Sequence, residues 1–196
     1  MTDIAKRLGR LHAAVGQTID TNLENFPATL GQSSKARFVY QDFRGGQSDE
    51  ELEIILQSLI ANIASLFGHL RHWARSTARG VDNVDEAFNR SLDLRIIMDL
   101  WNSDKHPGES RKGGYSKKRP KLANISSVMK MTARAGQGAT VMTLGVAGKP
   151  VCNVPGASRV VVTADVLDER GNNLGEINDM AERAIQVWEK LVDHLQ

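Results

Sequence analysis

One apolar repeat constrains the fold of this chain more than any other feature. Its residues recur at steps of three and four, the period of an amphipathic helix; they are Leu52, Leu56, Leu59, Ile63, Phe67, Leu70 and Trp73. Ser48 and Glu51 precede the repeat with the spacing of a capping box, in which each side chain bonds the backbone N–H of the other residue. The pattern predicts a helix from about Ser48 to Thr77 whose apolar face other elements must cover.

Three other segments have the same period and predict further helices. Their residues are 2–26, 83–106 and 178–196. Asn83, with acidic residues in the turn that follows, is a good N-cap, and Pro107 disfavours helical dihedrals at the residue before it. The segment 83–106 is therefore expected to be one continuous helix.

In the second half of the chain the period falls to about two, which is typical of strands. The alternation predicts a hairpin over residues 128–146 with a glycine-rich turn, then a strand at Ser158–Leu167 and a short return strand. The segment 28–47, which is rich in Gly and Ser, predicts a loop with at most one short strand at residues 37–41.

This order of elements predicts an α+β fold that is mainly helical, with three N-terminal helices, a central β-hairpin or small antiparallel sheet, and a C-terminal helix. At 196 residues the chain is long enough to bury the core of a single domain. The expected parts of that domain are a helical part at 1–106, a basic loop at 107–121, a β-hairpin part at 122–177 and the C-terminal helix at 178–196.

Composition and motifs exclude several classes of protein. Cys152 is the only cysteine, so an internal disulfide or a zinc site of several thiolates is excluded. The N-terminus lacks the apolar core of a signal peptide and no run approaches ~18 apolar residues, so we expect a cytoplasmic location and no membrane span. The P-loop, dinucleotide-binding, zinc-protease and serine-hydrolase motifs are absent, so neither a cofactor nor a bound metal is expected.

A polar stripe is predicted along the helix at 83–106. Arg95, Asp99, Asn102 and His106 are spaced so that, at 100° per residue, they fall within a wedge of about 60°. Apolar residues flank the wedge, so the stripe should be substantially buried, and buried polar groups need partners. The stripe is either a structural network, such as an ion pair between Arg95 and Asp99, or a functional site.

Positive charge is concentrated just beyond the stripe. The stretch from Lys105 to Lys121 has seven cations against Glu109 alone, a net charge of +6 with His106 neutral, in a chain whose total is +2. The cations are Lys105, Arg111, Lys112, Lys117, Lys118, Arg119 and Lys121. Gly113 and Gly114 favour a mobile loop, and Tyr115 offers a surface on which a base can stack. The loop therefore predicts binding of nucleic acid through its phosphates.

The segment Asp99-Leu-Trp-Asn-Ser-Asp-Lys-His-Pro107, which follows long helices, resembles the HEPN-like group of small helical proteins of bacterial defence and toxin systems. The final Trp188-Glu-Lys-Leu191 is similar to the C-terminal helix of bacterial proteins with an Asn-x-x-Lys-His-Pro signature. Catalytic HEPN-like proteins are metal-independent ribonucleases that use an Arg followed, after four to six residues, by a His. In this chain ten residues separate Arg95 from His106.

The resemblance implies RNA as the bound nucleic acid and leaves a ribonuclease activity open. His106 would then accept the proton of a ribose 2′-hydroxyl, and Arg95, Asn102 and Asp99 would complete the catalytic site. Arg7 and His12, in the first predicted helix, have the spacing of the family.

Other functions are left open. A non-catalytic scaffold would use the loop to bind an acidic protein partner, and His106 would then be only a helix-terminal cation. A metal-dependent hydrolase would need Asp99 and His106 to meet His69 or His72. The cations that end the second helix follow from the negative end of its dipole or form a second basic patch; they are His69, Arg71, His72 and Arg75. A homodimer is also compatible with the sequence.

Overall fold

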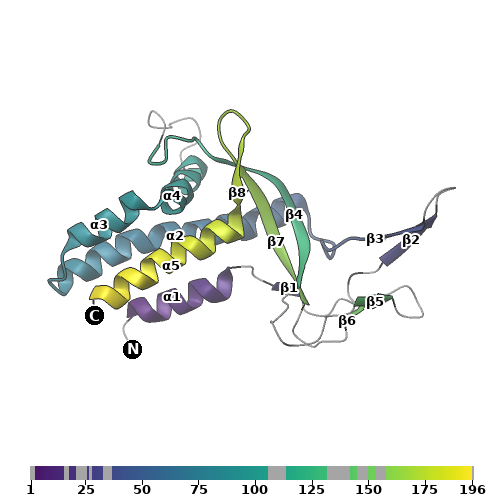
Figure 1. Ribbon diagram of the computed structural model, residues 1–196, viewed down its shortest axis with the longest axis horizontal. Helices are drawn as coiled ribbons and strands as arrows, with labels where there is room; N and C mark the ends of the chain where they lie inside the picture. The colour runs from purple at the N-terminus through teal and green to yellow at the C-terminus, as the bar shows by residue number, and fades with distance from the viewer. Residues whose placement is uncertain are drawn as a thin grey trace. The chain divides into compact units, whose positions relative to one another are not determined.

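The computed structural model is an α+β fold that is mainly helical, which confirms the expected fold class (Figure 1). It describes residues 3–15, 18–20, 26, 28–32, 37–105, 114–131, 142–144, 150–152 and 158–195. The helices are α1 (Asp3–Ala14), α2 (Asp49–Ser76), α3 (Val81–Arg90), α4 (Leu92–Lys105) and α5 (Ile177–Leu195). The strands are β1 (Thr18–Asp20), β2 (Ala28–Gln32), β3 (Arg37–Gln41), β4 (Lys121–Met131), β5 (Met142–Leu144), β6 (Pro150–Cys152), β7 (Ser158–Leu167) and β8 (Asn173–Glu176).

The chain divides into two compact units. The helical unit contains Met1–Gly16, Glu53–Ile125 and Thr163–Gln196. The strand unit contains Gln17–Leu52 and Ser126–Val162. Strand β7 contributes residues to both units, and the order in its sheet is β1-β7-β4, with β8 also paired to β7.

Helix α2 follows the sequence prediction closely. Both hydrogen bonds of the capping box are present, from Glu51 N to Ser48 Oγ at 3.2 Å and from Ser48 N to Glu51 Oε2 at 2.9 Å. By length and composition alone α2 could also cross a bilayer, but 39% of its most apolar window is buried inside the fold, and core helices meet the same criterion. Its apolar face belongs to the core.

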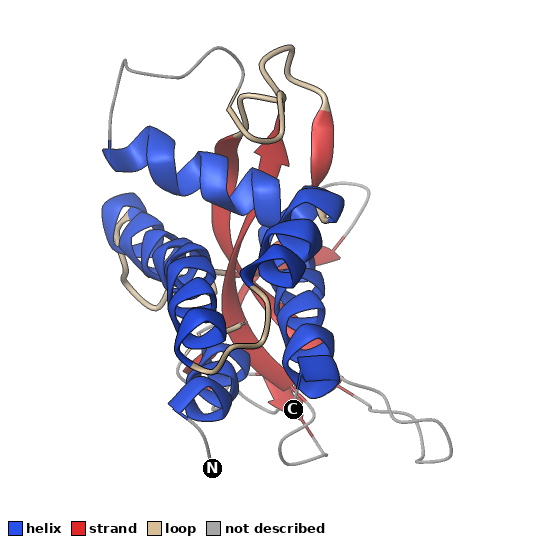
Figure 2. Ribbon diagram, turned by 90° about the vertical axis from the view of Figure 1, so that its left-hand side faces the viewer, coloured by secondary structure: helices blue, strands red, loops and turns tan. Residues whose placement is uncertain are grey.

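Aromatic packing joins the helices of the helical unit. Figure 2 looks toward the ends of these helices. Phe67 of α2 stacks on Phe88 of α3 with ring centroids 4.4 Å apart, and on the fully buried Trp188 of α5 at 6.1 Å. Helix α5 also packs against α1, α4 and β8. The rings therefore connect three helices through one continuous apolar contact.

An ion pair fixes α4 against α5. Arg183 donates from Nε and Nη2 to the two carboxylate oxygens of Asp93, at 2.8 and 3.0 Å. These side-chain hydrogen bonds raise the pKa of Arg183. Two parallel bonds between planar groups set an orientation as well as a distance, so the position of α4 is well defined.

The segment predicted as one helix over 83–106 is in fact two helices, α3 and α4. Ser91 separates them in an extended conformation, with φ −89° and ψ 115°. Its hydroxyl accepts a hydrogen bond from Leu94 N at 3.2 Å, so Ser91 is the N-cap of α4. The apolar period continues across the break, which is why the pattern did not reveal it. The cap predicted at Asn83 is also wrong, because α3 begins at Val81.

The first helix is shorter than predicted, because α1 ends at Ala14 and not at Phe26. The residues after it form β1, which pairs antiparallel with β7. Ladder pairing of β-branched residues such as Thr18 prevails here over the helical period. Phe26 is buried within the strand unit, where it packs with Val160 and contacts the ring of Phe43.

The hairpins of the strand unit differ from the prediction. Residues 28–47 contain two paired strands, β2 and β3, and not at most one. Strand β5 pairs with β6, and β4 belongs to the sheet of β7, so the hairpin predicted over residues 128–146 is wrong. Its predicted turn lies outside the described residues. The strand at Ser158–Leu167 and the return strand after it are confirmed as β7 and β8.

Candidate functional site

The site is organised by one buried carboxylate on α4. Asp99 is only 5% exposed. Its Oδ1 accepts a hydrogen bond from Tyr115 N at 2.7 Å, and its Oδ2 accepts bonds from Ser116 N at 2.7 Å and from Ser116 Oγ at 2.5 Å. Hydrogen bonds to an ionised acceptor are shorter and stronger than neutral ones, so Asp99 anchors the start of the segment that leads to β4.

Gly114 makes this approach of loop and helix possible. Its φ is +63°, in the left-handed region that favours glycine. A Cβ on Gly114 would lie under 3.0 Å from Oδ1, Oδ2 and Cγ of Asp99, closer than real Cβ contacts come. No other residue type could therefore keep this backbone in contact with the carboxylate.

The backbone beyond the anchor is also held in unusual conformations. Lys117 and Arg119 have φ values of 59° and 48°, which L-residues with a side chain rarely adopt. Ser116 Oγ, which donates to Asp99, also accepts a hydrogen bond from Lys118 N at 3.2 Å, and this bond closes the turn. Such conformations persist where surrounding contacts fix them, and they are frequent at functional sites.

The turn between β7 and β8 docks against this segment. Glu169 N donates to Lys118 O at 3.0 Å, and Arg119 Nη1 donates to Glu169 Oε2 at 3.0 Å. The turn itself is built on Asp168, whose pKa is lowered by hydrogen bonds from the side chain and backbone of Asn172 and from Arg170 N. Two loops that lie far apart in the sequence therefore form one surface.

We call this the loop surface. Its side chains are all exposed and all but one are cationic; they are Tyr115, Lys117, Lys118, Arg119, Lys121 and Arg170. Among the described residues of these two loops, the acidic groups are Asp168, whose carboxylate is bonded within its own turn, and Glu169, which pairs with Arg119. The surface therefore presents a net positive charge to solvent.

Tyr115 gives the loop surface an exposed aromatic ring. Tyr115 is 42% exposed, and its ring meets that of the buried Phe88 edge to face, with centroids 5.4 Å apart and planes at 86°. Arg95 donates to the backbone oxygens of Ser91 and Tyr115, at 3.3 and 3.5 Å. Its guanidinium therefore lies beside the same residue whose amide is bound by Asp99.

Part of the predicted polar stripe is observed on α4. Asp99 is buried and Arg95 and Asn102 are half-buried on α4, but Arg95 and Asp99, both described, form no ion pair with each other. His106, Arg111 and Lys112 lie outside the described residues, and Lys105 ends α4 with a side chain that is likewise outside them. The structure therefore brings Asp99, Arg95 and the second half of the loop together.

A metal site built on Asp99 and the α2 histidines finds no support in the described ranges. His69 Nε2 contacts Arg7 Nη1 at 3.3 Å, and the Asp99 carboxylate is surrounded by loop donors. Over those residues, no group of three or more His, Cys, Asp or Glu side chains could hold a metal ion.

Two residues of the site, Ser116 and Arg170, were not recognised from the sequence, and neither was the role of Asp99 as an acceptor for the loop. The sequence signal for the acceptor role of Asp99 was a single carboxylate among apolar residues, followed by a loop with paired glycines. The docking of the β7–β8 turn had no local signal, because it depends on how the strands pair.

Comparison of the chain with protein-family models, with curated proteins and with solved structures gave no match.

Proposed function

We propose that this protein binds nucleic acid, with RNA as the substrate class, through the loop surface. The observation that carries the proposal is the anchoring of Tyr115 and Ser116 by Asp99, which presents Lys117, Lys118 and Lys121 to solvent from a fixed backbone. A preordered set of cations loses less conformational entropy when it binds phosphates than a mobile loop does. Binding of this kind weakens steeply as salt is added, because counterions are released from the nucleic acid.

Tyr115 supports a single-stranded substrate. Its ring is exposed on one side and fixed by Phe88 on another, so it can stack on an unpaired base without first being ordered. Arg95 lies next to it and adds a cation that can reach a neighbouring phosphate. Bases within a duplex are already stacked, so this contact favours single strands or loops.

A ribonuclease activity is the further part of the proposal, and it follows the resemblance to HEPN-like proteins. His106 would act as the general base, with Arg95 and Asn102 near the reacting phosphate. Asp99 would support the site by holding the loop, since the hydrogen bonds to its carboxylate come from loop donors. We also propose that the protein acts in the cytoplasm, in a bacterial defence or toxin system.

The direct test is binding of a fluorescein-labelled 20-nucleotide RNA, measured by anisotropy in about 50 mM salt. The variant Lys117→Ala/Lys118→Ala should bind about tenfold more weakly, and the slope of log affinity against log salt should fall by about 1.4, since each phosphate contact contributes about 0.7 for single strands. The control Arg90→Ala/Lys190→Ala removes two exposed cations from α3 and α5 and should bind as the wild type does.

Equal affinity of the two variants would refute the proposal, and adding Arg119→Ala to the first should abolish most of the remaining binding. Tyr115→Ala should weaken binding to the single strand and leave binding to a duplex unchanged. For the ribonuclease part, His106→Ala should remove metal-independent cleavage and keep binding. Cleavage by the His106→Ala variant at the wild-type rate would refute that part alone.

A further inference from the structure

The helices α1 and α2 carry a second concentration of positive charge. From Ile4 to Ala14 and from Ile54 to Ser76, the sequence has five Lys or Arg residues, three His residues and no Asp or Glu. All the acidic residues of α2 are in its first turns, where they complement the positive end of the helix dipole. These two stretches of helix therefore carry no acidic residue of their own, although Arg71 pairs with Asp85 of α3 at 3.1 Å.

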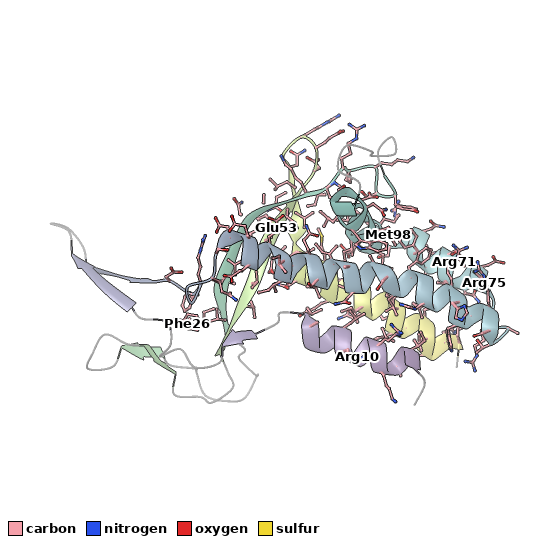
Figure 3. All side chains as sticks on the ribbon, turned by 180° about the vertical axis from the view of Figure 1, so that it is seen from behind. Arg10, Phe26, Glu53, Arg71, Arg75 and Met98 are labelled. Carbon is pink, nitrogen blue, oxygen red and sulfur yellow. The ribbon has the colours of Figure 1, made fainter. Side chains whose placement is uncertain are left out.

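The helix dipole does not explain the cations of α1. Lys6 lies at the end of the first turn of α1, where the dipole disfavours positive charge, and Arg7 and Arg10 lie before the last turn, where it favours positive charge. Lys6 and Arg10 are exposed on α1, where Figure 3 labels Arg10, and Arg10 Nε donates to Lys6 O of the same helix at 3.4 Å. Exposed cations that the helix dipole does not explain are better explained by a partner that is negatively charged.

The contact between α1 and α2 joins two of these groups directly. Arg7 Nη1 lies 3.3 Å from His69 Nε2, although the residues are 62 positions apart in the chain. A guanidinium can only donate, so His69 Nε2 is the acceptor in this contact. The contact places the Arg7 guanidinium beside the exposed His69, and His72, three residues further along α2, is also exposed. We call Lys6, Arg7, Arg10, His69 and His72 the α1–α2 surface.

The chemistry of this surface favours phosphates of a nucleic acid over a membrane. The apolar residues of α1 are buried in the core; they are Ile4, Leu8, Leu11 and Val15. Among the described residues, the exposed large hydrophobic side chains are Ile54, Leu92 and Tyr115, and none of these belongs to α1 or to the second half of α2. A helix that lies in a membrane interface needs an exposed apolar face, which α1 does not have.

The α1–α2 surface contains no Phe, Tyr or Trp ring for base stacking, and its only rings are the imidazoles of His69 and His72. Trp73, which lies near the end of α2, has the Arg79 guanidinium over its ring at 5.2 Å. We propose that the α1–α2 surface is a second binding site, which takes the backbone phosphates of a double-stranded nucleic acid. Arginine is suited to this role because its planar donors match the geometry of phosphate oxygens. Contacts of this kind position a duplex without reading its sequence.

The test compares two double variants of the full chain on a labelled 30-base-pair duplex at about 50 mM salt. Arg7→Gln/Arg10→Gln should lower the affinity about tenfold and lower the salt slope by about 1.8, since each phosphate contact contributes about 0.9 on a duplex. The control Arg90→Gln/Lys190→Gln should leave both quantities within twofold of the wild type. Binding of a single-stranded oligonucleotide through the loop surface should be unchanged by Arg7→Gln/Arg10→Gln.

Three results would overturn the inference: unchanged duplex affinity, an equal loss in the control, or a loss of binding to vesicles with 30% phosphatidylserine but not to the duplex. If Arg7→Gln/Arg10→Gln does not fold, Arg10→Glu tests the same surface at a fully exposed side chain. The loop-surface proposal fails separately, because its test uses Lys117→Ala/Lys118→Ala and a single strand. Loss of duplex binding with intact single-strand binding assigns the effect to the α1–α2 surface.

Discussion

The loop surface and the α1–α2 surface present similar charge on two different kinds of support. The cations of the α1–α2 surface project from helices whose apolar faces are buried, so their positions follow from the core. The cations of the loop surface follow a segment that has few apolar contacts of its own and is held by Asp99, Ser116 and the β7–β8 turn. Hydrogen bonds to buried polar groups therefore fix the loop, whereas apolar packing in the core fixes the helices.

This difference implies different sensitivities to mutation. On the α1–α2 surface a substitution should change binding by the charge it removes and little else. On the loop surface, the substitution of a single anchoring residue should displace several cations together, because they share one backbone path. The following predictions test this contrast.

The largest effect is expected for Gly114→Ala. The new Cβ overlaps the Asp99 carboxylate and the backbone remains at positive φ, so the anchor should open. We expect a loss of about 3 kcal/mol in the free energy of unfolding, from the strain and the broken charged hydrogen bonds, and RNA binding as weak as that of Lys117→Ala/Lys118→Ala. Urea unfolding and anisotropy measure the two quantities.

Gly171→Ala is the matched control for this substitution. Gly171 also has a positive φ, +83°, but nothing lies within 4 Å of the position that its Cβ would occupy. Gly171→Ala therefore measures backbone strain alone. It should lower the free energy of unfolding by about 1 kcal/mol, and the variant should still bind RNA. If Gly114→Ala behaves like Gly171→Ala, the anchor does not hold the surface.

A smaller effect, of opposite sign, is expected for Glu169→Gln. The carboxylate of Glu169 occupies Arg119 at 3.0 Å and competes with phosphate for it. Its neutralisation should therefore tighten RNA binding about three- to tenfold at low salt, whereas Glu182→Gln, on the exposed side of α5, should not. Equal or weaker binding by Glu169→Gln would show that phosphates do not use this arginine.

The smallest effect concerns the acid stability of the β7–β8 turn. Hydrogen bonds from Asn172 lower the pKa of Asp168 below its ordinary 3.8. The ionised carboxylate therefore stabilises the folded state above that pH, and this stabilisation is lost as the pH falls below it. Wild-type protein should therefore lose stability between about pH 4 and 2 more steeply than Asp168→Asn, in urea titrations at each pH. Parallel plots of unfolding free energy against pH for the two proteins would contradict this role of the turn.

The sequence predicted the elements that depend on local pattern. The periods of α2 and α5, the capping box at Ser48 and the strand at Ser158–Leu167 are each set by residues within one element. The fold class followed from their order. The position of the cationic segment beside α4 was also predicted, as far as the described residues test it.

The failures share one physical cause, which is competition between a local period and a contact made elsewhere. Ser91 caps a new helix inside an unbroken apolar period, and Thr18 joins β7 in place of extending α1. In the site, Asp99 was expected to pair with Arg95, four residues away, but it accepts bonds from residues 16 and 17 positions away. Such a pairing depends on the path of the loop, which no local pattern encodes.

Amide hydrogen exchange of Tyr115 and Ser116 tests the central claim most directly. In the wild type both amides donate to Asp99 at 2.7 Å and should exchange slowly, although the loop is at the surface. In Asp99→Asn they should exchange about a hundredfold faster, as expected for the loss of about 2.7 kcal/mol of charged hydrogen bonding, with α5 amides unchanged. Unprotected exchange of these two amides in the wild type would contradict the account.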